Sequence, residues 1–187
     1  MSARLPLLRG ALLTTAAFGV MAVLSSGASA QSVPPNFLEE FESQFGASAS
    51  KLVALARAMP ESTYDWTPGE GVATVARVYM HIARYNYMYP DQNMGRHTPV
   101  SAAEYDRWEE EVSDKEEVLE ILEASMEYVR SVAEHMSAAD LDNGTRLYGR
   151  QVGEWAVLFQ LVAHMNEHLG QSIAYARMNG VVPPWSR

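Results

Sequence analysis

The sequence contains no cysteine among its 187 residues, which excludes disulfide bonds, cysteine nucleophiles and cysteine-ligated zinc. Basic residues are also few: 14 Lys and Arg stand against 23 Asp and Glu, for a formal net charge of −9. Because an acidic chain repels phosphate groups, we expect neither nucleic acid nor an anionic membrane surface as a partner. Stability must then come from the packing of the core, together with any ion that the protein binds.

The first thirty residues have the form of a secretory signal peptide. Arg4 and Arg9 give a positive start, an apolar run from Ala11 to Leu24 follows, and Ala28-Ser29-Ala30 matches the small-x-small pattern that signal peptidase cuts. The apolar run is shorter than the roughly 20 residues needed to span a bilayer, which argues against an uncleaved anchor. We therefore expect cleavage near Ala30 and a mature protein that is periplasmic or secreted, with no membrane attachment.

The mature chain, residues 31–187, has a length that suits a single domain. Its formal charge is −11, because the leader removes two of the 14 basic residues and none of the 23 acidic ones. Its apolar periodicity is helical almost throughout, and no stretch shows sustained strand-like alternation. We therefore predict an all-α fold.

Four helices are predicted from apolar stripes and end signals, at about residues 36–58, 72–89, 113–136 and 153–179. Capping boxes are expected at Asn36 with Glu39 and at Ser113 with Glu116, while Pro60 and Pro90 favour helix ends. The connection over residues 91–112 is long for a helical bundle and allows the next helix to run parallel to the last. These features predict a four-helix bundle with one long crossover, in up-down-down-up order.

Three histidines are the strongest chemical signal. His164 and His168 are four residues apart on the inner face of the last predicted helix, and His81 lies at the edge of the apolar face of the second. Three imidazoles can bind one divalent ion and leave a coordination position open, as in catalytic rather than structural metal sites. The residues alone leave open the alternative that these histidines only pack in the core. The remaining two, His97 in the crossover and His135 at a helix C-terminus, are explained by solvation and by the helix dipole.

The chain resembles the DinB-like superfamily of four-helix bundles, described as metal-dependent hydrolases or thiol-dependent transferases. The residues that carry the resemblance are Met59-Pro60-Glu61, Tyr64, Trp66-Thr67-Pro68, the segment Val75 to Ala83, the segment His164 to Gln171, and the ending Tyr175 to Ser186. The resemblance implies that His81, His164 and His168 form the metal triad, with zinc or nickel as the usual ion. Imidazole suits several divalent ions, so the ligands do not name the metal, and zinc is the favoured expectation.

Metal-assisted hydrolysis of a small molecule is the leading functional expectation. Thiol-dependent transfer is the alternative from the same superfamily, although low-molecular-weight thiols are mainly cytoplasmic, which argues against it for an exported protein. A non-catalytic metal-binding or interaction bundle is a further alternative. A homodimer is compatible with a bundle of this kind, although no apolar stripe in the sequence demands one. Gln171 is expected to hold the second nitrogen of a ligating ring. Glu154, ten residues before His164, is about 15 Å away along the helix and therefore too far to act as a base.

Overall fold

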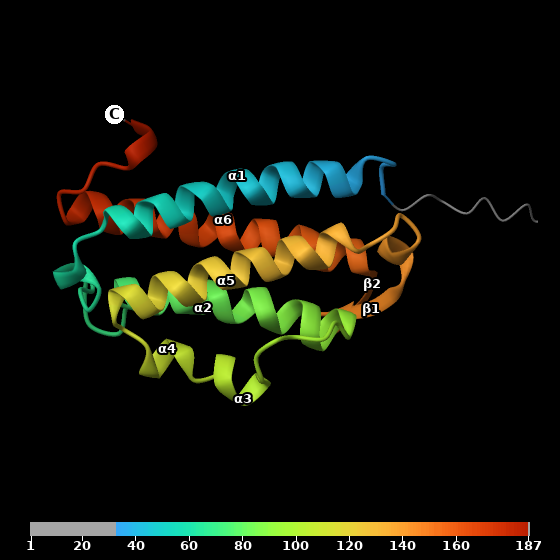
Figure 1. Ribbon diagram of the computed structural model, residues 1–187, viewed down its shortest axis with the longest axis horizontal. Helices are drawn as coiled ribbons and strands as arrows, with labels where there is room; N and C mark the ends of the chain where they lie inside the picture. The colour runs from blue at the N-terminus through green and yellow to red at the C-terminus, as the bar shows by residue number, and fades with distance from the viewer. Residues whose placement is uncertain (1–32, 187) are drawn as a thin grey trace, which may run out of the picture. The chain divides into compact units, whose positions relative to one another are not determined.

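Four long helices make up most of the protein in this computed structural model, which describes residues 33–186 (Figure 1). They are α1 (Phe37–Ala58), α2 (Val75–Met88), α5 (Lys115–Glu134) and α6 (Glu154–Met178). The described residues form one compact unit. The predicted signal peptide lies outside the described residues.

The order of the helices is the predicted up-down-down-up arrangement. In Figure 1, α1 and α6 run in one direction and α2 and α5 in the other, with α2 packed on α5 and α1 packed on α6. The parallel pair α2 and α5 is joined by the long crossover. This segment holds a π-helical turn (Tyr89–Asn93) and two short helices, α3 (Ala102–Tyr105) and α4 (Trp108–Glu111), which lie against α2. The predicted all-α bundle with one long crossover is therefore confirmed.

The helix ends differ in detail from the sequence-based prediction. The predicted capping box at Ser113 is wrong by one residue, because Asp114 is the N-cap of α5 and its side chain accepts hydrogen bonds from the backbone N–H groups of Glu116 and Glu117. The side chain of Asn36 makes no capping bond at the start of α1. Pro90 also does not stop the helical path at once, because it lies at the start of the π-helical turn, where its missing N–H costs little.

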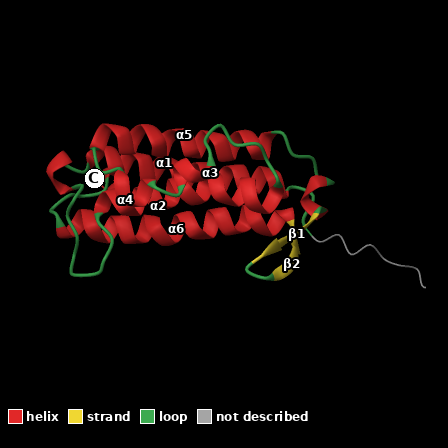
Figure 2. Cartoon of the chain, turned by 90° about the horizontal axis from the view of Figure 1, so that it is seen from below, coloured by secondary structure: helices red, strands yellow, loops and turns green. Residues whose placement is uncertain are grey.

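A small β-hairpin precedes α6 and was not predicted. Strands β1 (Gly144–Leu147) and β2 (Arg150–Gly153) pair antiparallel, with Leu147 opposite Arg150. Figure 2 shows the hairpin at one end of the bundle, beside the start of α6. Four residues per strand are too few for an alternating pattern to stand out from the surrounding turn signals.

The core is formed by the inner stripes of the four long helices. Its largest fully buried side chains include Phe45, Leu52, Met80, Leu122 and Leu158. A buried polar bond joins two helices within this core, since Asn86 of α2 donates to the hydroxyl of Ser125 of α5 at 3.0 Å. Short 3₁₀ turns at Glu61–Thr63, Asp140–Asp142 and Pro184–Ser186 complete the described elements. No helix within residues 33–186 has the length and apolar character that crossing a membrane requires.

Candidate metal centre

The three predicted histidines meet between α2 and α6. One ring nitrogen from each of His81, His164 and His168 lies within 4.8 Å of the others. The ring centroids are 4.6 Å apart for His164 and His168, and 5.1 and 4.8 Å for His81 against each of them. Zn–N bonds of 2.0–2.1 Å place tetrahedral ligand nitrogens about 3.4 Å apart, so small side-chain rotations would bring these rings to coordination distance. The donor set therefore fits a divalent ion such as zinc.

The exposure of the three rings is unequal. His164 is buried, with 7% of its surface exposed, whereas His81 and His168 are half-buried. Solvent therefore reaches the triad at His81 and His168. Three protein ligands with one accessible side match the arrangement expected of a reactive metal site.

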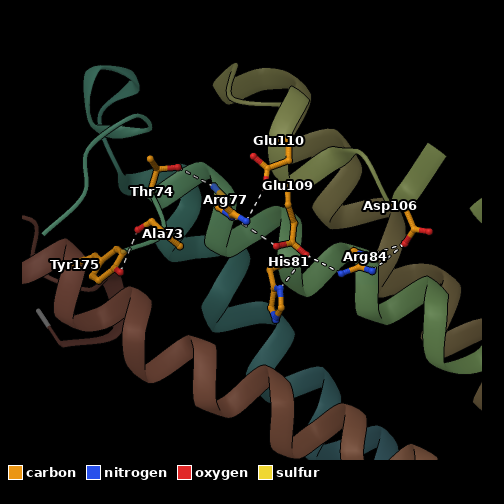
Figure 3. A network of polar contacts seen from close by, with 9 residues as sticks. All are labelled: Ala73, Thr74, Arg77, His81, Arg84, Asp106, Glu109, Glu110 and Tyr175. Carbon is orange, nitrogen blue, oxygen red and sulfur yellow. Dashed lines mark hydrogen bonds and ion pairs between the residues drawn. The ribbon is translucent and has the colours of Figure 1, made fainter. Parts of the chain in front are cut away.

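His81 is oriented by a carboxylate from the crossover. Its Nδ1 lies 2.9 Å from Oε1 of Glu109 in α4, and the same oxygen accepts from Nη1 of Arg84 at 3.2 Å. Arg77 forms a longer ion pair of 3.7 Å with the other carboxylate oxygen (Figure 3). Because the carboxylate accepts the Nδ1 proton, the lone pair of His81 is left on Nε2, the nitrogen available to an ion.

The pKa of Glu109 shows how strongly its surroundings favour the charged form. Desolvation by burial raises it, but the hydrogen bonds and charges of His81 and Arg84 outweigh this and lower the pKa to about 2. Glu109 is therefore an anion at neutral pH. It holds a proton on His81 and is not free to take one from a substrate.

His168 is oriented by a chain of three hydrogen bonds that ends on the backbone. Nδ1 of His168 lies 2.8 Å from Oε1 of Gln171, Nε2 of Gln171 donates to the hydroxyl of Tyr175 at 2.9 Å, and that hydroxyl donates to the carbonyl of Ala73 at 3.2 Å. The carbonyl of Ala73 can only accept, which fixes the direction of every bond in the chain. Nδ1 of His168 therefore carries the proton and Nε2 is free, and the hydrogen bond expected between Gln171 and a ring of the triad is present.

His164 is kept neutral by its environment. Burial, followed by the neighbouring charges of His168 and His81, lowers the pKa of His164 to about 3. Its ring packs against that of Tyr85, with the centroids 4.7 Å apart, and Tyr85 also lies 4.6 Å from His81. A neutral imidazole is the form that binds metal, so burial prepares His164 as a ligand.

A comparison with known families places the bundle. The model of the DinB superfamily matches residues 44–176. The chain belongs to the DinB superfamily. No curated protein matches it.

Two solved structures share the DinB fold with this chain. A DinB-like protein from Bacillus cereus is 17% identical, with a TM-score of 0.67, over 78% of this chain and 95% of its own. A DinB-like protein from Bacillus subtilis is 18% identical, with a TM-score of 0.56, over 79% of this chain and 93% of its own. At this level of identity, the likeness establishes the DinB fold and not the chemistry.

The other candidate residues of this DinB protein lie away from the triad. Glu154 is buried and pairs with Arg96, in agreement with its exclusion as a base at the triad. His135 is the C-cap of α5, and its Nδ1 bonds the carbonyl of Ser131, while His97 is exposed in the crossover. The roles expected for both histidines from their positions are thus consistent with the structure.

Two residues beside the triad were given no role from the sequence. Tyr85 follows His81 by four residues, so helical spacing places it near His81 on the same helix, but aromatic residues at helical spacing more often belong to the core. Glu109 gave no such signal, because it stands in a run of three glutamates in a segment without a clear apolar stripe.

Proposed function

We propose that this protein is an exported, metal-dependent hydrolase that acts on a small molecule, with His81, His164 and His168 as the ligands of a divalent ion. The observation that carries the proposal is the convergence of three imidazole nitrogens, two of them on rings whose Nδ1 is held by an acceptor. Zinc is the proposed ion and nickel the alternative, since imidazole binds either. The leader-like pattern in residues 1–30 supports export.

A divalent ion at this triad would supply Lewis-acid chemistry, which polarises a carbonyl and activates water. The protein's own residues provide the setting. Glu109 and the chain through Gln171 fix the orientation of two rings, and burial holds the third in its neutral form. Tyr85 covers one side of the triad with a ring that packs on both His81 and His164, which limits the access of water from that side.

Metal analysis of the untagged mature protein tests the site. We expect about one equivalent of zinc or nickel in the wild type and its loss in His81→Ala. The variant His135→Ala removes a histidine that is placed elsewhere and should retain the metal, which controls for general effects of histidine removal. A wild-type protein without stoichiometric metal, after exposure to both ions, would reject the site.

An activity panel tests the reaction. Aryl esters, lactones and a thiol-transfer assay with a low-molecular-weight thiol should separate hydrolysis from transfer. We expect ester or lactone hydrolysis that disappears in His164→Ala while the circular dichroism spectrum of the folded bundle persists. Turnover only in the presence of thiol would favour the transferase, and metal binding without turnover in the whole panel would favour a binding protein.

A further inference from the structure

A row of tyrosine rings leads away from the triad along α2. Tyr85 follows His81 by four residues and Tyr89 by eight, which places the three side chains on one face at intervals of about 6 Å. The ring centroids of Tyr85 and Tyr89 are 5.1 Å apart, and Tyr148 of the hairpin continues the row at 6.5 Å from Tyr89. We call Tyr85, Tyr89 and Tyr148 the aromatic row.

The two ends of the aromatic row are accessible and its middle is not. Tyr148 is 65% exposed and Tyr85 is half-buried, whereas Tyr89 is only 2% exposed. The hydroxyl of Tyr148 is hydrogen-bonded to that of Tyr89, so the exposed ring is held in place by the buried one. Tyr85 and Tyr148 are therefore the two rings of the row that a bound molecule could contact, and the buried Tyr89 lies between them.

Tyr148 occupies a backbone position that disfavours its side chain. Its φ is 50° and that of Gly149 is 76°, so both residues of the two-residue hairpin loop are left-handed, as in a type I′ turn. Such turns favour Asn-Gly or Asp-Gly, and a tyrosine at the first position is strained. The backbone thus disfavours tyrosine here, and the hydroxyl bond to Tyr89 accounts for only one end of a side chain that is otherwise 65% exposed and open to a ligand.

The hairpin that carries Tyr148 is fixed to the end of α2. Asn93, in the π-helical turn after α2, donates to the carbonyl of Arg146 at 2.6 Å, and the hydroxyl of Thr145 donates to the carbonyl of Asn93. Leu147 is buried in the core next to the tip. These contacts set the position of the Tyr148 ring relative to the row, as required of a residue that contacts a ligand.

We propose that Tyr148, together with Tyr85, determines specificity by selecting small molecules that carry an extended flat aromatic group beyond the bond that reacts. The proposal rests on the proposed metal-dependent function, because the histidines fix the reacting end of the molecule. The ring centroid of Tyr89 is 6.2 Å from that of His164 and 6.5 Å from that of Tyr148, so the ring of Tyr148 can lie no further than about 13 Å from that of His164. Two linked phenyl rings with a chelating group at one end have roughly this length.

Hydroxamates, which chelate divalent ions, allow a test by binding rather than turnover. Acetohydroxamate, benzohydroxamate and biphenyl-4-hydroxamate are titrated into the zinc-loaded mature protein by calorimetry. We expect affinity to rise in that order. Tyr148→Ala should weaken the biphenyl compound by roughly 2- to 10-fold, the range of one aromatic contact, and leave acetohydroxamate unchanged.

Two further variants serve as controls. Phe159→Ala removes a ring of α6 that is 63% exposed, close to the exposure of Tyr148, and should leave all three affinities unchanged. Tyr148→Asn should weaken the biphenyl compound as Tyr148→Ala does, while the melting temperature changes little, because the better fit of Asn-Gly to the turn offsets the lost hydroxyl bond to Tyr89.

The outcomes separate this inference from the proposed function. Three results would overturn the role of Tyr148 and leave the metal site standing. They are an equal loss of affinity for all three hydroxamates in Tyr148→Ala, no loss of affinity for any of them, or a matching loss in Phe159→Ala. A lower melting temperature of Tyr148→Asn with unchanged biphenyl affinity would make Tyr148 a structural residue. If acetohydroxamate binds equally well with and without zinc, the metal site itself fails, and the inference fails with it.

Discussion

Replacing Glu109 by alanine should weaken metal binding although Glu109 is not expected to touch the ion. The carboxylate accepts the Nδ1 proton of His81 at 2.9 Å and so fixes both the tautomer and the rotation of that ring. Without it, His81 can rotate or place its proton on Nε2, and each of these changes removes one of three ligands from part of the population. The substitution should change the orientation of His81 and leave the rings of His164 and His168 unaltered.

The size of the loss in metal affinity depends on what replaces the carboxylate as the partner of His81. Loss of such a partner typically costs 10- to 100-fold in metal affinity, or about 1.4 to 2.8 kcal/mol at 1.4 kcal/mol per tenfold. The side chain of His81 is 29% exposed, so water can take over part of the hydrogen bond, which favours the lower half of this range. Arg84 keeps Asp106 as a partner at 3.0 Å, so the lost anion does not leave an unpaired buried cation. We therefore expect a loss near tenfold for Glu109→Ala.

Glu109→Gln separates charge from hydrogen bonding. The amide oxygen can still accept from Nδ1, so this variant should lose less affinity than Glu109→Ala. The matched control is Glu110→Ala, which removes the neighbouring carboxylate of α4, 68% exposed and paired with Arg77 at 2.7 Å. Zinc competition with a chromophoric chelator gives the dissociation constants. Wild-type affinity in Glu109→Ala, or an equal loss in Glu110→Ala, would refute the reasoning.

The remaining predictions concern stability. Phe45→Ala removes a fully buried ring and should lower the free energy of unfolding by about 3–5 kcal/mol in urea denaturation. Phe159→Ala removes an exposed ring and should change the free energy of unfolding by about 0.5 kcal/mol or less. Similar losses in the two variants would contradict the described core. Zinc at 100 times its dissociation constant should stabilise the protein by about 2.7 kcal/mol, and this gain should disappear with a chelator or in His81→Ala; a gain that persists in His81→Ala would place the ion elsewhere. Hydrogen bonds from the backbone N–H and the hydroxyl of Ser137 lower the pKa of Asp140 below its ordinary 3.8, so its stabilising effect is present above pH 4 and lost as the pH falls through the lowered pKa. Asp140→Asn should thus be less stable than wild type at pH 7, with a difference that narrows toward pH 2 in thermal melts; a constant difference would show that the charge of Asp140 is irrelevant.

The bundle could be predicted because its helices are long and their apolar stripes are regular. The stripe from Val118 to Val129 and the capping signals before it place α5 within two residues of its observed bounds. The direction of each helix followed from the connection lengths, since the crossover between α2 and α5 is the longest of the three connections between the long helices and joins the parallel neighbours. The hairpin escaped prediction because its pairing depends on a turn, Tyr148-Gly149, whose first residue is not one that such turns favour.

The three histidines could be predicted from helical spacing, but only one of the two residues that accept hydrogen bonds from them could. His164 and His168 share a helical face by spacing alone, and the position of His81 in the stripe of α2 points it toward the same interior. The acceptor for His168 lies three residues away on the same helix, so helical geometry also predicts Gln171. The acceptor for His81 lies 28 residues away on a four-residue helix, and spacing cannot tell which of Glu109, Glu110 and Glu111 faces α2.

The difference between the three rings bears on where a substrate can approach. The two rings with hydrogen-bonded acceptors, His81 and His168, are also the two that solvent reaches, and an accessible imidazole needs a fixed partner to hold one orientation. His164 instead lies among the rings of His81, His168, Tyr85 and Tyr89, where packing restricts its rotation. A ligand that enters from the accessible side therefore meets rings that are held by Glu109 and Gln171. Variants of these two residues should alter the binding of small chelating ligands. Variants that fill the space near His164 should instead alter how tightly the ion is retained.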